Sequence, residues 1–167
     1  MGLIDQMLIE GKDSKLYQSL VQEKGYTSAV NGGINYLGNM FDYNGPMLWM
    51  SDLIYDSTVK ADDVIAEYDK AITQLDKVTQ ADLDLALIKM RSNLYDQIGG
   101  GLGIGKLNML ASFALFYDNP AMINTLEDSF KKVTPGIIRK TAKEYLRSTN
   151  RTILIVDPKA PKSQAKN

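Results

Sequence analysis

The chain of 167 residues contains no cysteine and no histidine. The absence of cysteine excludes disulfides, thiol nucleophiles and thiolate metal sites. The absence of histidine removes the side chain whose ordinary pKa lies near neutrality, and leaves only carboxylates for zinc, an ion that proteins normally hold with Cys or His. The sequence therefore predicts no catalytic residue, no metal ligand and no cofactor in this chain.

An excess of positive charge is lacking as well. Lys and Arg number 19 against 20 Asp and Glu, so no basic surplus is available to neutralise phosphates or anionic lipid. The longest apolar stretches, such as 107–117, fall well short of the roughly 20 residues that span a bilayer. We expect no nucleic-acid partner and no membrane partner. With 44% hydrophobic residues, the composition fits one globular domain.

Apolar residues at helical spacing predict that most of the chain is helical. Thr79 and Asp82 resemble a capping box, and the pairs Asn119-Pro120 and Thr134-Pro135 each place a capping residue before a proline at the first helical position. Glycine residues in 99–105 end one helix and connect it to the next. The predicted helices lie at about 3–8, 14–24, 64–75, 80–98, 107–117, 120–130 and 135–145.

Three segments are expected to be strands. Alternation of Ser28, Val30, Gly32 and Ile34 predicts a strand over 26–34, which would pair with a second strand at 47–50. The β-branched run 151–156 predicts a third strand. The resulting fold class is α+β, a small and largely antiparallel sheet with helices packed on one face. We expect residues 1–158 to form one domain and residues 159–167 to form a disordered tail.

The glycine-rich segment Gly100–Lys106 matches most of a phosphate-binding loop. The match fails because Leu107 stands where Ser or Thr should bind magnesium, and because the preceding segment is helical where a strand is required. We interpret the segment as a connector in which glycine allows positive φ and close packing. A nucleotide-binding module remains an alternative.

Other candidate groups have a structural interpretation. The carboxylate pairs Asp62/Asp63 and Asp82/Asp84 fall in the first turns of predicted helices, where they interact favourably with the helix dipole. No histidine can activate a serine, so only a Ser-Lys dyad is left open for Ser14, Ser28, Ser51 or Ser112. The predicted loop also carries three aromatic residues, Tyr36, Phe41 and Tyr43. We favour a packing role for them over a role in binding a partner.

Several segments resemble, in the same order, the C-terminal domain of M16 (insulinase/pitrilysin-like) zinc metallopeptidases. They are 11–20, 22–26, 45–49, 110–116, 133–135, 141–147 and 150–154. The resemblance implies the metallohydrolase fold shared by LuxS and the mitochondrial processing peptidase, whose domains start with a strand that would precede Leu3. It also implies one half of a clamshell that closes around a peptide chamber.

In that family one half carries His-x-x-Glu-His and zinc, and the other supplies chamber wall and substrate contacts. Because it has no histidine, this chain corresponds to the second half and should not be an enzyme by itself. Its implied partners are a zinc-binding half, fused or separate, and a peptide or unfolded protein substrate.

Many non-catalytic halves hold substrate with an Arg and a Tyr, and here Val21 and Ser28 occupy those positions. We therefore expect a peptide to pair with the backbone of the strand from Tyr26, which makes Tyr26, Ser28 and Val30 the candidate substrate-binding residues. Such a strand would lie at an exposed sheet edge, and a homodimer could form through it. The alternative function is a structural or assembly subunit, like the core subunits of the respiratory bc1 complex.

Overall fold

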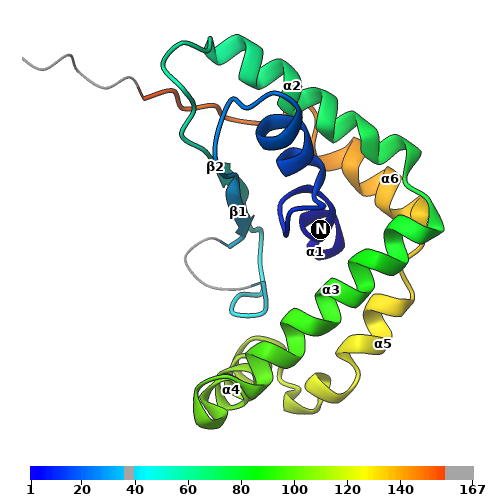
Figure 1. Cartoon of the computed structure of the whole chain (residues 1–167). Coiled ribbons are helices and arrows are strands. Elements are labelled where there is room, and N and C mark those ends of the chain that lie inside the picture. Colours follow the sequence, from blue (N-terminus) through cyan, green and yellow to red (C-terminus); the bar gives the residue numbers. More distant parts are fainter. Residues whose placement is uncertain (36–39, 157–167) are drawn as a thin grey trace, which may run out of the picture.

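A buried helix lies at the centre of the molecule. The computed structural model describes residues 1–35 and 40–156, and its first helix, α1 (Gly2–Leu8), is buried from Leu3 to Leu8. Helices α3 (Gln80–Gly99) and α6 (Pro135–Tyr145) and strand β1 (Asn31–Ile34) all contact α1. Figure 1 shows α1 in the middle, with α2 (Ala61–Thr73) and α6 on one side and the strands on the other.

All seven segments predicted to be helical contain helix, although 14–24 is mainly a π-helix and 120–130 is divided into a 3-10 helix and a short α-helix. Local sequence signals explain where several helices begin. The Thr79 side chain accepts a hydrogen bond from the Asp82 N–H, and the Asp82 side chain accepts one from the Thr79 N–H, which completes the capping box of α3. Thr134 caps α6, with Pro135 in its first turn. The remaining elements are the π-helix Tyr17–Glu23, the 3-10 helices Gln74–Lys77, Gly101–Gly103 and Pro120–Asn124, and the α-helices α4 (Ile104–Tyr117) and α5 (Leu126–Lys131).

The apolar residues form two clusters. The larger cluster surrounds α1 and includes Leu16, Leu20, Leu75 and Leu83, all fully buried. The smaller cluster lies between α3, α4 and α5 and is built around Phe113, whose ring meets that of Phe41 edge-on at 5.6 Å between centroids. The packing role expected for Phe41 is therefore confirmed.

The glycine segment joins α3 to α4 through a tight approach of their backbones. A Cβ on Gly105 would lie 1.7 Å from the Gln97 carbonyl oxygen, a distance that no side chain could occupy. Gly101 and Gly103 have φ of 60° and 90°, where glycine is favoured. The segment thus has the packing role that the sequence predicted.

No single helix in the described part of the chain is both long and apolar enough to cross a membrane. Helices α3 and α4 meet the criterion only when taken together, and they are bent by 103° relative to each other.

The sheet is a two-stranded antiparallel hairpin with the helices on one of its faces (Figure 1). Strand β1 pairs with β2 (Trp49–Asp52), and Asn31 lies opposite Asp52 while Ile34 lies opposite Trp49. Gly32 is required at its position because a Cβ there would lie 2.4 Å from the Met50 carbonyl oxygen. The predicted α+β class, with a small antiparallel sheet, is therefore confirmed.

Two strand predictions need correction. The first strand begins at Asn31 rather than at residue 26, because the Tyr26 N–H donates to the Leu20 carbonyl oxygen and continues the preceding helical turn. Residues 151–156 were expected to be a third strand, but the structure assigns no strand to them. β-Branched residues suit a pleated surface, yet a strand also needs a neighbour to accept its ladder hydrogen bonds. The predicted tail at 159–167 lies outside the described residues.

Candidate functional site

Two hydrogen bonds attach one face of the hairpin to the helices. The Trp49 indole Nε1–H donates to Asp5 Oδ1 of α1 at 2.7 Å, and the hydroxyls of Ser51 and Tyr68 are hydrogen-bonded. Burial raises the pKa of Tyr68 to about 12, so its hydroxyl stays protonated at neutral pH. These contacts fix which face of the hairpin is covered by α1 and α2.

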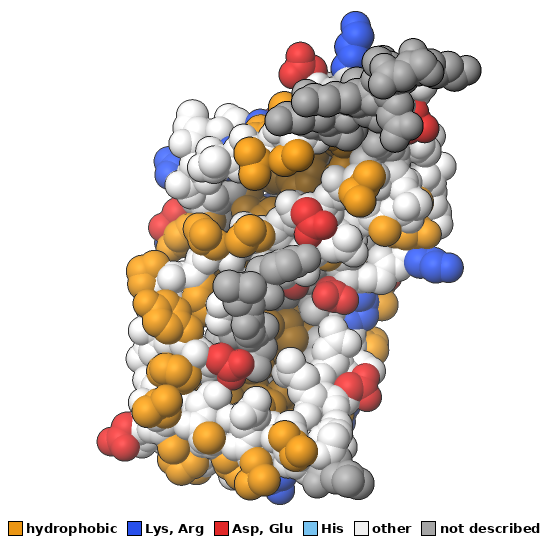
Figure 2. Space-filling model, turned by 90° about the vertical axis from the view of Figure 1, so that its left-hand side faces the viewer, with side chains coloured by type: hydrophobic (Ala, Val, Ile, Leu, Met, Phe, Trp, Pro, Cys, Tyr) orange, Lys and Arg blue, Asp and Glu red, His pale blue; other side chains and the backbone are white. Residues whose placement is uncertain are grey.

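The opposite face of the hairpin is open and largely apolar along β2, with the hydrogen-bonded pair Asn31 and Asp52 as its polar part. Leu48 and Ile54, which flank β2, are 73% and 89% exposed, and Met50 between them is also exposed. Figure 2 looks at the molecule from the hairpin side and shows several groups of hydrophobic side chains there, with charged side chains between them. Exposed apolar groups on one side of a molecule are typical of a surface that meets a partner or ligand.

The free edge of β1 can be assigned from the hairpin register. The Asn35 N–H donates to the Leu48 carbonyl oxygen at 3.1 Å, so this pair belongs to the hydrogen-bonded positions of the ladder. Such positions alternate along an antiparallel pair, which places Gly33 and Asn31 in the same set. The backbone groups of Gly32 and Ile34 therefore point to the other edge of β1, where the described residues contribute no strand.

The three predicted substrate-binding residues lie before β1 rather than within it. Both backbone groups of Tyr26 are engaged, since its N–H donates to Leu20 and its carbonyl accepts from the Asp56 N–H. Ser28 is exposed, and Val30 is half-buried against the larger core. Val30 precedes the assigned strand, and extending the alternation of β1 by one residue predicts for its backbone the same outward orientation as for Gly32 and Ile34.

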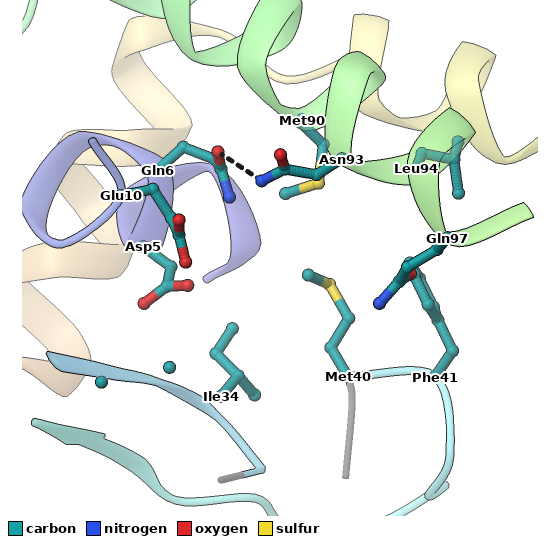
Figure 3. A pocket seen from close by; sticks show the side chains of 12 residues that line it. Asp5, Gln6, Glu10, Ile34, Met40, Phe41, Met90, Asn93, Leu94 and Gln97 are labelled. Atoms are coloured by element: carbon teal, nitrogen blue, oxygen red, sulfur yellow. Dashed lines mark hydrogen bonds between the residues drawn. The ribbon is translucent and has the colours of Figure 1, made fainter. Parts of the chain in front are cut away.

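A pocket of about 180 Å³ lies beside this edge, between α1, β1 and α3. Asp5 is only 6% exposed, Glu10 is half-buried, and the Asn93 and Gln97 amides of α3 are exposed. Gln6, Gly32 and Gly33 also line the pocket, and Asn93 donates a hydrogen bond to Gln6. The apolar part of the lining lies mainly at the end away from the Asp5 and Glu10 carboxylates, as Figure 3 shows, and consists of Ile34, Met40, Phe41, Met90 and Leu94.

The pocket is acidic. Burial is the main cause of the raised pKa of Asp5; the Trp49 hydrogen bond opposes the shift, and repulsion from Glu10 adds to it. Among the residues that the structure describes, no Lys or Arg lines the pocket. The nearby Lys89 ammonium is engaged elsewhere, since it donates to the carbonyl oxygens of Gln6 and Glu10 and forms an ion pair with Asp13.

The other sequence candidates do not come together as a reactive site. Asp82 serves the α3 cap, and its hydrogen bonds from Thr79 lower its pKa. The Ser112 hydroxyl donates to Asp42, and Tyr43 is exposed. Tyr36 lies outside the described residues. Nowhere in 1–35 and 40–156 do three or more acidic side chains gather closely enough to hold a metal ion.

Comparison with known proteins supports the fold. No protein-family model matches the chain, and no curated protein matches it significantly. A solved structure described as a protease from Helicobacter pylori superposes with a TM-score of 0.69 at 19% sequence identity. The match covers 89% of this chain and 34% of that one, so the chain spans about a third of the protease's length. The chain thus has the fold of one part of a protease structure.

Sequence reasoning missed the pocket because its residues come from three distant segments. The signal available in the sequence was in α1, where the polar residues Asp5 and Gln6 stand between apolar residues of a short helix. Buried polar residues require partners, so this pair could have been marked as lining an internal site.

Proposed function

We propose that the chain is the non-catalytic half of an M16-type zinc metallopeptidase, which forms chamber wall and binds substrate for a zinc-binding half. The observation that carries this proposal is the hairpin, whose inner face packs on helices while its outer face and one β1 edge are open. The ordered sequence resemblance and the protease with a similar fold both favour this assignment.

Substrate contact would occur through the free edge of β1. Outward backbone groups at Val30, Gly32 and Ile34 can accept an extended peptide as an added strand, a mode that needs no reactive side chain. The apolar face with Leu48, Met50 and Ile54 would line the chamber beside it. The chain's contribution to catalysis is then to position the peptide, and positioning alone can lower a barrier by several kcal/mol.

The test is reconstitution with the cognate zinc-binding half. We expect the mixture to hydrolyse peptides orders of magnitude faster than the zinc-binding half alone, while the isolated chain hydrolyses none. Val30→Pro removes an outward N–H and should reduce the gain, whereas Val30→Ala keeps that N–H and should retain most of it. Lys106→Ala should have little effect because the glycine segment has a packing role.

The main alternative is a structural or assembly subunit without proteolytic function. The absence of the usual Arg and Tyr, replaced by Val21 and Ser28, favours it. If the two halves associate in sedimentation experiments but the mixture is no more active than the zinc-binding half alone, the peptidase proposal fails and the structural role replaces it.

A further inference from the structure

The acidic pocket has the chemistry of a receptor for a cation on an apolar stem. Its base is a buried carboxylate, its walls are methionine and other apolar side chains, and its rim carries amides and a second carboxylate. We propose that this pocket binds the side chain of a lysine or arginine residue, with the cation at Asp5 and Glu10 and the methylene stem against Met40 and Met90.

The position of Asp5 supports this assignment. Trp49 occupies one carboxylate oxygen, Oδ1, while the other, Oδ2, faces Gly33 of the pocket wall, where a Cβ would lie 4.0 Å from it. Figure 3 shows the Asp5 and Glu10 carboxylates side by side. Two neighbouring carboxylates repel each other, and a cation placed between them removes that repulsion and replaces the lost hydration of Asp5.

The size and walls of the pocket select the ligand. A volume of about 180 Å³ admits one long side chain rather than a folded segment. Lysine and arginine bury their methylene stems on apolar surface while their cations seek polar partners. An anionic or purely apolar side chain would bring no cation to Asp5 and Glu10, and we expect such ligands to bind poorly.

Single-residue ligands test the pocket without involving the free edge of β1. Nα-acetyl-lysine amide, its arginine analogue and its norleucine analogue would each be titrated into the whole chain. Trp49 is the only tryptophan, so its indole N–H gives a unique NMR signal, and this N–H donates to the carboxylate in question. We expect the lysine or arginine ligand to bind at least about ten-fold tighter than norleucine, since charge-assisted hydrogen bonds are strong in desolvated sites.

Two matched variants assign the effect to the pocket. Asp5→Asn keeps an oxygen acceptor for Trp49 but removes the charge, and should reduce the preference over norleucine to within about two-fold. Glu10→Gln should reduce it partially. Asp96→Asn removes an exposed charge from α3 outside the pocket lining and should leave the preference unchanged.

Equal binding of lysine, arginine and norleucine ligands, or no change in the indole signal with any of them, would overturn the inference. A preference for lysine over arginine would restrict the site to ammonium groups, and the reverse would restrict it to guanidinium groups. Because these ligands are too short to form a strand along β1, failure here leaves the proposed peptidase role standing, and failure of reconstitution leaves this site standing.

Discussion

At the residue scale, the contact between Trp49 and Asp5 joins the hairpin to the central helix. Trp49→Phe removes the one side-chain donor that the described residues offer to the Asp5 carboxylate, which is 6% exposed. We expect a loss of about 1–3 kcal/mol in the free energy of unfolding, the usual cost of leaving a buried acceptor unsatisfied. Urea titration followed by circular dichroism would measure it.

Tyr95→Phe is the matched control for that measurement, since it removes an exposed hydroxyl that donates to Glu127 at 3.2 Å. A surface contact of this kind should cost less than about 0.5 kcal/mol. Equal losses in the two variants would contradict a special role for the buried contact.

Asp5 also gives stability a defined pH dependence. Its pKa in the folded chain is raised above the ordinary 3.8, so folded protein retains a proton that unfolded protein has released. The contribution of Asp5 to stability is therefore present in full below pH 3.8 and is lost as pH rises through the folded pKa. Asp5→Asn cannot titrate, so its stability relative to the natural chain should rise over that interval and then level off. A difference that is flat with pH would refute this.

Gly105 and Gly99 differ in what surrounds them. Gly105→Ala would place a Cβ 1.7 Å from a backbone oxygen of α3, and we expect the α3–α4 junction to shift at a cost of more than about 2 kcal/mol. Gly99 is the last residue of α3, and a Cβ there would meet nothing within 4 Å, so Gly99→Ala should be neutral or stabilising by up to about 1 kcal/mol. Thermal unfolding of the pair would compare them directly.

At the element scale, the start of α3 is stabilised by two hydrogen bonds between Thr79 and Asp82, in which each side chain accepts from the backbone N–H of the other residue. Thr79→Ala and Asp82→Ala should each cost about 1 kcal/mol, because each leaves one helix-terminal N–H without its partner. The double variant should lose less than the sum of the two single losses, since both changes break the same contact. Additive losses in chemical denaturation would show that the two residues act separately.

Helices were predictable because their signals are local. Thr79, Asp82 and Thr134 act within one turn of themselves, and the apolar stripe from Val64 to Leu75 specifies its own buried side. Strands were less predictable because pairing depends on distant residues. The run 151–156 has strand composition, but without a neighbouring strand its Leu154 and Val156 side chains remain exposed.

The candidate site was predictable only in part, for the same reason. The sequence predicted the segment from Tyr26 as a peptide-binding edge but not which of its backbone groups point outward. That orientation follows from the hydrogen bond between Asn35 and Leu48, which defines which residues of β1 pair with β2. The pocket depends on Asp5, Gly33 and Asn93 meeting in space. Nothing in their spacing along the chain indicates this.

At the scale of the whole molecule, the open apolar face should affect association rather than stability. Ile54→Ser and Leu48→Ser alter side chains that are 89% and 73% exposed, so we expect changes of less than about 0.5 kcal/mol in unfolding free energy. Both should weaken self-association of the chain in analytical ultracentrifugation and, under the proposed function, peptide binding by the reconstituted pair. Leu115→Ser, which alters an exposed residue of α4, is the control that should leave association unchanged.

The central position of α1 has a consequence for how the chain is made. Helix α1 buries most of its side chains, yet one of the elements that contacts it, α6, lies far later in the chain and ends at Tyr145. The core around α1 is therefore complete only after most of the chain has been synthesised. Until then, its apolar side chains, such as Leu3, Ile4 and Leu8, lack some of the residues that bury them. Nascent chains of this kind are bound by chaperones and aggregate when translation stalls. The apolar residues of α1 therefore stay exposed to aggregation until α6 has been made.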